Sequence, residues 1–352
     1  MLTHPTNRAG VLACLISLLA LVSTPLRGSA EDAQPLKVCA TIPDLGSLAR
    51  EIGGDQVAVT VFCKPSEDPH FVEAKPSFMK ALSQADLFIV VGMELEVGYA
   101  PVLLTGARNG RVLVNSPGYV DASQVIDALD VPTGTIDRSL GDVHSFGNPH
   151  YMLDPLNGLK VAALLRDRMT KLRPEKADYF KARYDDFRKR LGNTMVGEKL
   201  AEKYELEKLA LLAEHGRLGE FLKEQGEDNL LGGWLSAMLA RRGTKYADEH
   251  ALWVYFARRF GLENIGHMEP VPGIQPTTKQ LGMLIDKMRA ERIPLILHTP
   301  YYDIKHARFV ADKTGAKVVT LANQVGAIPG TDDYISMIDV NVRLVAGALE
   351  GK

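Results

Sequence analysis

The sequence predicts an α/β protein with two domains, each a parallel sheet flanked by helices, joined by a long rigid helix. Three observations support this fold class. Short apolar stretches, typical of buried strands, alternate with helical stretches in both halves of the chain. A strongly charged helical stretch separates the two halves. The length of 352 residues suits two domains better than one.

The first half contains one set of alternating elements. Strands are expected at 37–42, 57–62, 86–91 and 111–114, and helices from about 45 to 53 and from 77 to 84. The pair Gly53-Gly54 is typical of a helix C-terminus, and Ser77 suits a helix N-cap. Residues 116–148 show no clear periodicity, so we interpret them as a surface loop.

A connector and a second set of elements follow. Residues 157–195 have a charged helical pattern, in which Pro174 starts a new helix at its first turn. Phe180 and Phe187 then share one apolar face. Further helices are expected within 200–240. Strands are then expected at 244–247, 264–268, 294–297 and 317–321, and helices at 250–260, 304–314 and 334–349, with one more helix capped by Thr277.

The N-terminus has the three-part layout of a secretory signal peptide. Arg8 precedes an apolar run from Val11 to Val22, and the small residues Gly28–Ala30 come before an acidic pair. The run is short for a transmembrane anchor. Cys14 imitates a lipidation site but lies at the start of the apolar run, so we discount it. We therefore expect a periplasmic protein, exported through a cleavable signal and not inserted in the membrane afterwards.

These patterns divide the chain into four parts. They are a signal peptide (1–30), an N-terminal α/β domain (31–172), a linker helix (173–199) and a C-terminal α/β domain (200–352). The formal net charge of −2 gives no electrostatic basis for binding nucleic acid. Cys39 and Cys63 remain after export, either as a disulfide or as two buried free thiols.

Three of the nine histidines stand out by their place in the predicted fold. His70 follows the second expected strand, and His250 follows the strand that opens the second half. His150 lies on a turn between two prolines. Because ligands of open α/β sheets bind beyond the carboxyl ends of the strands, we expect these side chains to meet in a cleft between the domains. Three neutral imidazoles suit Zn²⁺ best, and Cu²⁺, Mn²⁺ and Fe²⁺ less well.

The neighbours of these histidines carry further expectations. Asp154 follows His150 by four residues and is expected to orient its ring by accepting a hydrogen bond. The alternative is a rigid turn whose histidine only hydrogen-bonds to backbone. His215 and His306 lie on polar helical stretches and are expected to be solvated. His267 lies inside an expected strand and is expected in the core.

Several motifs resemble the solute-binding proteins of zinc and manganese ABC importers, the ZnuA/TroA type (cluster A-I). The matching segments are Asp68-Pro69-His70-Phe71 with Lys75-Pro76-Ser77, Asn148-Pro149-His150 with Leu153-Asp154-Pro155, His250-Ala251 with 255–262, and 334–341. The three histidine motifs occur in family order, and the resemblance covers nearly the whole chain after residue 30.

The resemblance implies a function and a set of site residues. It implies that His70, His150 and His250 are metal ligands in a cleft between two domains joined by a long helix. It also implies a non-enzymatic protein that captures Zn²⁺, with Mn²⁺ as a possible ligand, and delivers it to the membrane permease of an ABC transporter. We expect a monomer. A manganese- or iron-binding member of the same family is an alternative.

The fourth coordination position is open. The family often places an acidic residue in the loop after the penultimate strand, where this chain has Asn323. Water, Asp333 or His144 could fill the position instead. A zinc-dependent hydrolase is a second functional hypothesis, since three histidines and a water also describe a catalytic site. Glu67 and Glu73 flank His70, but the sequence has no His-Glu-x-x-His segment.

Overall fold

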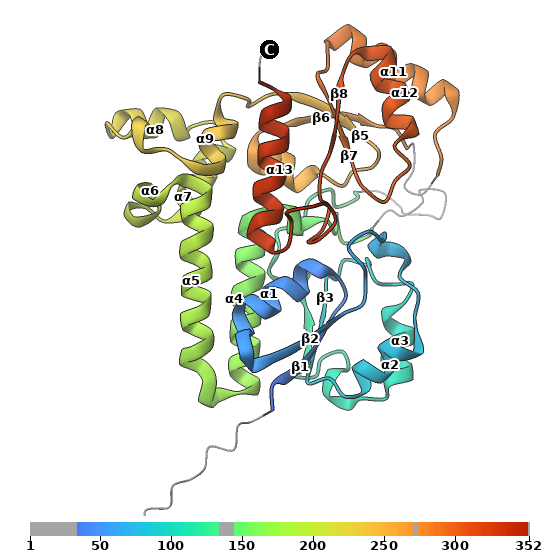
Figure 1. Cartoon of the computed structure of the whole chain (residues 1–352), viewed down its shortest axis with the longest axis vertical. Coiled ribbons are helices and arrows are strands. Elements are labelled where there is room, and N and C mark those ends of the chain that lie inside the picture. The colour runs from blue at the N-terminus through green and yellow to red at the C-terminus, as the bar shows by residue number, and fades with distance from the viewer. Residues whose placement is uncertain (1–33, 134–143, 270–273, 351–352) are drawn as a thin grey trace, which may run out of the picture. The chain divides into compact units, whose positions relative to one another are not determined.

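The computed structural model describes residues 34–133, 144–269 and 274–350 (Figure 1). These residues contain two four-stranded sheets, with strand orders β2-β1-β3-β4 and β6-β5-β7-β8, in which every pairing is parallel. The predicted fold class of parallel sheets flanked by helices is therefore confirmed. The signal peptide expected at 1–30 lies outside the described residues.

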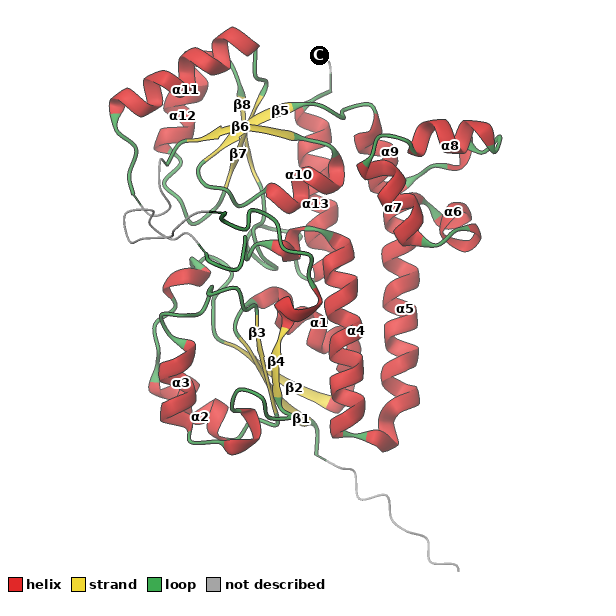
Figure 2. Ribbon diagram, turned by 180° about the vertical axis from the view of Figure 1, so that it is seen from behind, coloured by secondary structure: helices red, strands yellow, loops and turns green. Residues whose placement is uncertain are grey.

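The first sheet forms from strands close to those predicted. Its strands are β1 (Leu36–Ala40), β2 (Val57–Val61), β3 (Leu87–Val90) and β4 (Tyr119–Asp121). The accompanying helices are α1 (Pro43–Gly53), α2 (Pro76–Ser83) and α3 (Ala100–Ala107). Figure 2 shows α2 and α3 on the face of this sheet opposite to α1. All four residues of β3 are buried, as expected for a central parallel strand covered on both faces.

Two predictions in this half are wrong. The stretch 111–114 is not a strand, because Gly110–Val112 forms a 3₁₀ turn (η3) started by Asn109, and Val114 is exposed. The fourth strand is β4, inside the region interpreted as a loop. A three-residue strand is too short to show a periodicity, which is why the sequence does not reveal it.

The start of α2 also differs from the prediction. Pro76 is its first residue, Lys75 holds the N-cap position, and no side chain caps the helix. Ser77 is therefore not the N-cap. Pro76 fixes the backbone of the first turn, and its missing N–H costs no hydrogen bond because the first amides of a helix have no acceptor within the helix.

The connector consists of two adjacent long helices. They are α4 (Pro155–Leu172) and, after a 3₁₀ turn at Pro174–Lys176, α5 (Ala177–Val196). Phe180 and Phe187 are buried, as predicted for the apolar face. Both views show α4 and α5 side by side (Figures 1 and 2). Four short helices follow: α6 (Glu198–Lys203), α7 (Leu206–Glu214), α8 (Leu218–Glu224) and α9 (Gly233–Leu239). The domain limits at 172 and 199 stay a prediction.

The second sheet repeats the architecture of the first. Its strands are β5 (Lys245–Asp248), β6 (Glu263–His267), β7 (Leu295–His298) and β8 (Lys317–Thr320). Its helices are α10 (Val254–Phe260), α11 (Thr278–Glu291), α12 (Lys305–Thr314) and α13 (Tyr334–Ala348). Thr277 caps α11 in a reciprocal capping box with Gln280, as the sequence predicts.

The last helix ties the two sheets together. Tyr334 Oη, at the start of α13, donates hydrogen bonds to the carbonyl oxygens of Met152 (2.6 Å) and Asp154 (3.1 Å). Its backbone amide donates to Ser47 Oγ at 3.1 Å. Cys39 and Cys63 are both buried as free thiols, so the disulfide alternative is wrong. Among the described helices, none has both the length and the apolarity needed to cross a membrane.

Candidate metal site

His70 is held in one orientation by the residue two positions before it. Asp68 begins the 3₁₀ turn η2 (Pro69–Phe71), and its Oδ1 accepts hydrogen bonds from the backbone amide of His70 (3.0 Å) and from its ring Nδ1 (2.7 Å). This contact places the ring proton on Nδ1 and leaves a lone pair on Nε2. The sequence motif Asp68-Pro69-His70 thus places a histidine next to the carboxylate that orients its ring.

The turn that carries His150 is anchored by Asn148. The Oδ1 atom of Asn148 accepts from the His150 amide at 3.0 Å, and its Nδ2 donates to the Ala251 carbonyl at 2.6 Å. Tyr255 Oη also donates to the Asn148 carbonyl at 3.0 Å. Because Ala251 is the residue next to His250, one buried amide fixes the turns of two predicted ligands against each other.

Three predicted ligand side chains converge. The ring centroids are 5.3 Å apart for His70 and His150, 5.7 Å for His150 and His250, and 6.3 Å for His70 and His250. They come from the loops after β2 and β5 and from the turn before α4, so both sheets contribute. His150 Nε2 is buried and has no hydrogen-bond partner among the described residues.

The three rings lie close together, but their present positions do not form a complete metal site. Within the described part of the chain, no three His, Cys, Asp or Glu side chains are close enough together to hold a metal ion as they stand. The three ring centroids nevertheless lie within 6.3 Å of each other.

The surroundings of His150 and His250 keep these two imidazoles neutral. Burial, reinforced by the nearby His70, lowers the pKa of His250 to about 3. Burial and the neighbouring histidines lower the pKa of His150 well below its usual value. A neutral imidazole offers the lone pair that a metal ion needs, so the site is prepared to bind a cation without first losing protons.

The expected role of Asp154 is wrong. Its carboxylate caps α4 through the Leu156 amide at 2.9 Å and binds the Arg259 guanidinium at 2.9 and 2.8 Å. It therefore does not orient the His150 ring. Asp154 and Arg259 instead form a buried ion pair that joins the start of α4 to α10.

The candidates for the fourth position differ in their availability. Asn323 Oδ1 is buried and unpartnered among the described atoms, which leaves it a candidate. Asp333 is used as the N-cap of α13, in a reciprocal capping box with Ser336. His144 lies against the site: its Nε2 is 3.2 Å from His70 Nε2, and the two rings stack with centroids 5.3 Å apart.

Gln324, which the sequence gives no reason to single out, fixes the loop that carries His70. Its Nε2 atom donates to the carbonyl oxygens of Lys64 (3.0 Å), Pro65 (3.0 Å) and Glu67 (2.9 Å). The contact crosses about 260 residues of sequence, so no local pattern could reveal it.

Two further histidines pair with carboxylates beside His250. His267 Nδ1 lies 2.6 Å from Asp248 Oδ1, and His298 Nδ1 lies 2.5 Å from Glu249 Oε1. The prediction that His267 is a core residue is wrong, since its side chain is 35% exposed at the end of β6. His215 is exposed and His306 half-buried, so only His215 fits the expected solvation fully.

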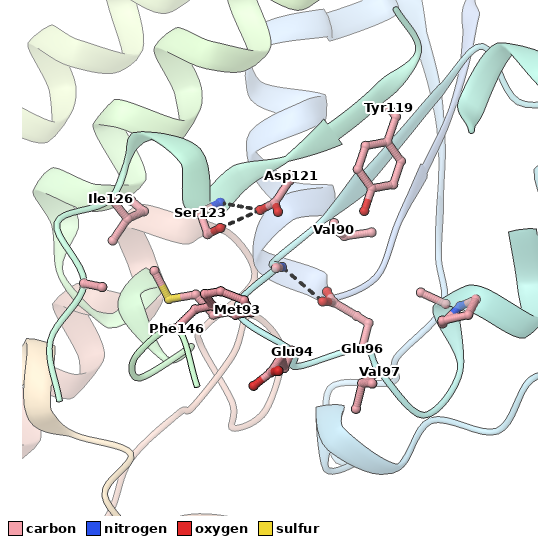
Figure 3. A pocket seen from close by; sticks show the side chains of 14 residues that line it. Val90, Met93, Glu94, Glu96, Val97, Tyr119, Asp121, Ser123, Ile126 and Phe146 are labelled. Carbon is pink, nitrogen blue, oxygen red and sulfur yellow. Dashed lines mark hydrogen bonds between the residues drawn. The ribbon is translucent and has the colours of Figure 1, made fainter. Parts of the chain in front are cut away.

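A cavity of about 570 Å³ lies beside the segment that carries His144 (Figure 3). Met93, Glu94, Glu96 and Phe146 contribute to its wall. Thr41 and the amides of Val91 and Gly92 donate to the Glu96 carboxylate, yet burial raises its pKa to about 7.

Comparison with known proteins identifies a family for almost the whole described chain. Residues 38–230 and 225–348 match the model of the family described as zinc-uptake complex component A, periplasmic (ZnuA). The manganese-binding lipoprotein MntA of Halalkalibacterium halodurans is 24% identical over 92% of this chain and 91% of its own length. The metal ABC transporter substrate-binding lipoprotein FimA of Streptococcus parasanguinis is 24% identical over 97% of this chain and 98% of its own length.

A zinc-binding relative and solved structures agree with this match. The zinc-binding protein AdcA of Streptococcus pyogenes is 22% identical over 88% of this chain, which spans 55% of AdcA. A zinc-bound ZnuA deletion mutant superposes with a TM-score of 0.65 and 23% identity, over 90% of this chain and 99% of its own. A manganese-bound periplasmic metal binding protein from candidatus Liberibacter asiaticus gives a TM-score of 0.61 at 16% identity, over 88% of this chain and 98% of its own. These structures share the fold.

Proposed function

We propose, from the premise that this chain belongs to the family of periplasmic component A of zinc-uptake complexes, that it captures Zn²⁺ with His70, His150 and His250 and delivers it to the permease of an ABC transporter. The family resemblance expected from the motifs is confirmed. Since the matched relatives include proteins named as substrate-binding components, the prediction of a binding protein and not an enzyme is also confirmed, and the hydrolase hypothesis is set aside.

One observation carries the proposed site. Three imidazoles from three separate segments meet with ring centroids 5.3 to 6.3 Å apart, and the one whose Nε2 is buried has no other partner among the described atoms. A core histidine is normally satisfied by a hydrogen bond. An orphaned ring nitrogen beside two other imidazoles supports a cation site in preference to a rigid turn.

The donor set favours zinc. Imidazole nitrogens suit Zn²⁺, whereas Mn²⁺ prefers oxygen donors. The nearby carboxylates are engaged elsewhere, Asp68 with the His70 ring and Asp154 with Arg259. Relatives are named for manganese as well as zinc, so a manganese-binding protein is the alternative, with Asn323 as an oxygen donor.

Capture by local adjustment fits the contacts between the sheets. Gln324, Tyr334 and Asn148 each hydrogen-bond across segments far apart in the sequence and hold the ligand-bearing turns. Opening a wide cleft would break these buried contacts. Rotation of the three rings within fixed turns would not, and it is the smaller change that coordination requires.

The place of action follows the same proposal. The protein is exported, acts in the periplasm as a monomer after loss of residues 1–30, and meets a membrane permease. Two matched relatives are named lipoproteins, which makes a lipid anchor the alternative to a free mature chain. Mass spectrometry of the exported protein should give a chain that starts near Glu31. A lipid-modified cysteine at the start of the mature chain would show that the protein is anchored to the membrane by a lipid and is not free.

A competition titration tests the site. The mature protein should bind one Zn²⁺ and prefer it to Mn²⁺ at equal concentrations. His150→Ala should abolish tight binding, whereas His215→Ala, which changes an exposed histidine, should not. Equal zinc affinity in the two variants would show that His150 is not a ligand and would contradict the proposed site. Retention of Mn²⁺ in preference to Zn²⁺ would contradict the proposal that zinc is the bound metal.

A further inference from the structure

We propose that His144 supplies the fourth nitrogen ligand of the metal and thereby sets its preference for zinc. This inference rests on the proposed three-histidine site and deepens it. His144 precedes His150 by six residues, and its side chain reaches the site from outside the three turns described above.

The separation of the two ring nitrogens matches shared coordination. His144 Nε2 lies 3.2 Å from His70 Nε2. Two nitrogens bound at about 2.0–2.1 Å to one tetrahedral zinc ion lie about 3.3–3.4 Å apart.

The tautomer of His70 supports the same reading. Its Nδ1 proton is held by Asp68 at 2.7 Å, so its Nε2 presents a lone pair toward His144. Without metal, His144 satisfies this lone pair only by donating its own Nε2 proton. A cation between the two nitrogens takes the place of that proton, which moves to Nδ1 of His144, so that both rings stay neutral and each offers its Nε2 lone pair.

The segment of His144 is built into the structure by contacts outside the site. The amide of Ser145 donates to Glu94 Oε2 at 2.6 Å, and the amide of Gly147 donates to the His144 carbonyl at 3.2 Å. Phe146 lines the adjacent cavity together with Met93 and Glu94 (Figure 3).

The turn that receives this segment is strained. Gly92, Met93 and Glu94 have φ values of +82°, +50° and +67°. Two consecutive non-glycine residues in the left-handed region are costly, and such strain persists only where surrounding contacts hold it. Here the strained turn presents Glu94 to the Ser145 amide, and so fixes the residue next to His144.

The other candidates for the fourth position are poorer donors. Asp333 is used as a helix cap. Asn323 offers a neutral amide oxygen, which binds zinc more weakly than an imidazole nitrogen. Four imidazoles make a set that Mn²⁺ matches badly, so His144 would act on metal choice as well as on affinity.

Competition titration of zinc and manganese with matched histidine variants tests this inference. His144→Ala should weaken zinc binding by at least about 100-fold, the upper end of what loss of a mere supporting residue costs. It should weaken manganese binding less and so narrow the preference for zinc. His215→Ala is the control for removal of a histidine, and Asn323→Ala, which should change little, is the control for the fourth position.

The outcomes distinguish a failure of the fourth-ligand assignment from a failure of the proposed three-histidine site. If His150→Ala abolishes zinc binding while His144→Ala is silent, the fourth-ligand assignment is wrong and the three-histidine site stands. If both are silent, the proposed site itself fails. Cobalt substitution gives a second readout: the absorption of tetrahedral Co²⁺ in the wild type should change in His144→Gln, and an unchanged spectrum would overturn the assignment even if the alanine variant misfolds.

Discussion

Asp154 and Arg259 form a two-point ion pair, with Nε–Oδ1 and Nη2–Oδ2 distances of 2.9 and 2.8 Å. Both side chains are less than a tenth exposed. The pair connects the first residue before α4 to α10, and thus the turn after His150 to the helix after His250. Removing Arg259 leaves the Asp154 carboxylate as a buried charge without its ion-pair partner.

Arg259→Leu should therefore destabilise the fold by about 3–5 kcal/mol, the usual cost of breaking a buried pair from one side. Arg343→Ala is the control, since the exposed Arg343 pairs with Asp339 one turn away on α13 and such surface pairs contribute only about 0–1 kcal/mol. Urea unfolding of the metal-free protein measures both. Equal losses in the two variants would contradict the importance of the buried pair.

Loss of the carboxylate that orients His70 should weaken zinc binding. Asp68→Ala removes the acceptor of the Nδ1 proton, and such supporting contacts typically contribute about 10–100-fold in metal affinity. Asp68→Asn keeps an acceptor oxygen and should lose less. Glu73→Ala, an exposed carboxylate three residues after His70, serves as the control. An Asp68→Ala affinity equal to that of Glu73→Ala would remove Asp68 from the site.

Metal-free protein should lose stability on acidification through its buried histidines. Burial lowers the pKa of His250 to about 3, and burial with the nearby His70 lowers that of His144 to about 4. In the unfolded chain these rings have their ordinary pKa of about 6.5. As the pH falls below about 6.5, the unfolded state takes up protons that the folded state does not, so the free energy of unfolding decreases until about pH 3.

The His250→Gln variant checks this sign. It removes one suppressed titration, so its free energy of unfolding should fall less steeply between about pH 6.5 and 4 than that of the wild type. Urea unfolding at several pH values measures both slopes. A variant slope as steep as the wild type would show that His250 titrates normally in the folded protein.

The anchor of the His70 loop should contribute to both stability and binding. Gln324→Leu leaves the Lys64, Pro65 and Glu67 carbonyls without their shared donor, at a cost of about 1–3 kcal/mol. Zinc affinity should fall together with stability because the loop carries His70. A destabilised variant with unchanged zinc affinity would mean that the loop position does not depend on this anchor.

The sequence predicts most strands of the two sheets because they are short apolar runs. It predicts the flanking helices because residues typical of helix ends mark several of their limits. Thr277 caps α11, as the local pattern indicates. The sequence does not predict β4, because three residues are too few to show a periodicity. The stretch 111–114 is wrongly predicted as a strand, because an apolar run alone does not distinguish a strand from a turn.

The site is predictable in part for a similar reason. His70, His150 and His250 stand beside prolines or strand ends, which are local signals. The partner of Asp154 is Arg259, 105 residues away. The prediction that Asp154 orients His150, four residues before it, is therefore wrong. The approach of His144 to His70 depends on Glu94, 51 residues before Ser145 in the chain. Such contacts follow from the fold and leave no mark in a short window of sequence.

X-ray absorption at the zinc edge of the stoichiometric complex tests the central claim most directly, because it counts the imidazoles around the metal. The account predicts a nitrogen shell at about 2.0–2.1 Å with the scattering pattern of at least three imidazoles, and the loss of one imidazole in any residual complex of His150→Ala. A shell dominated by oxygen without imidazole scattering, or a spectrum unchanged by His150→Ala, would contradict the three-histidine site.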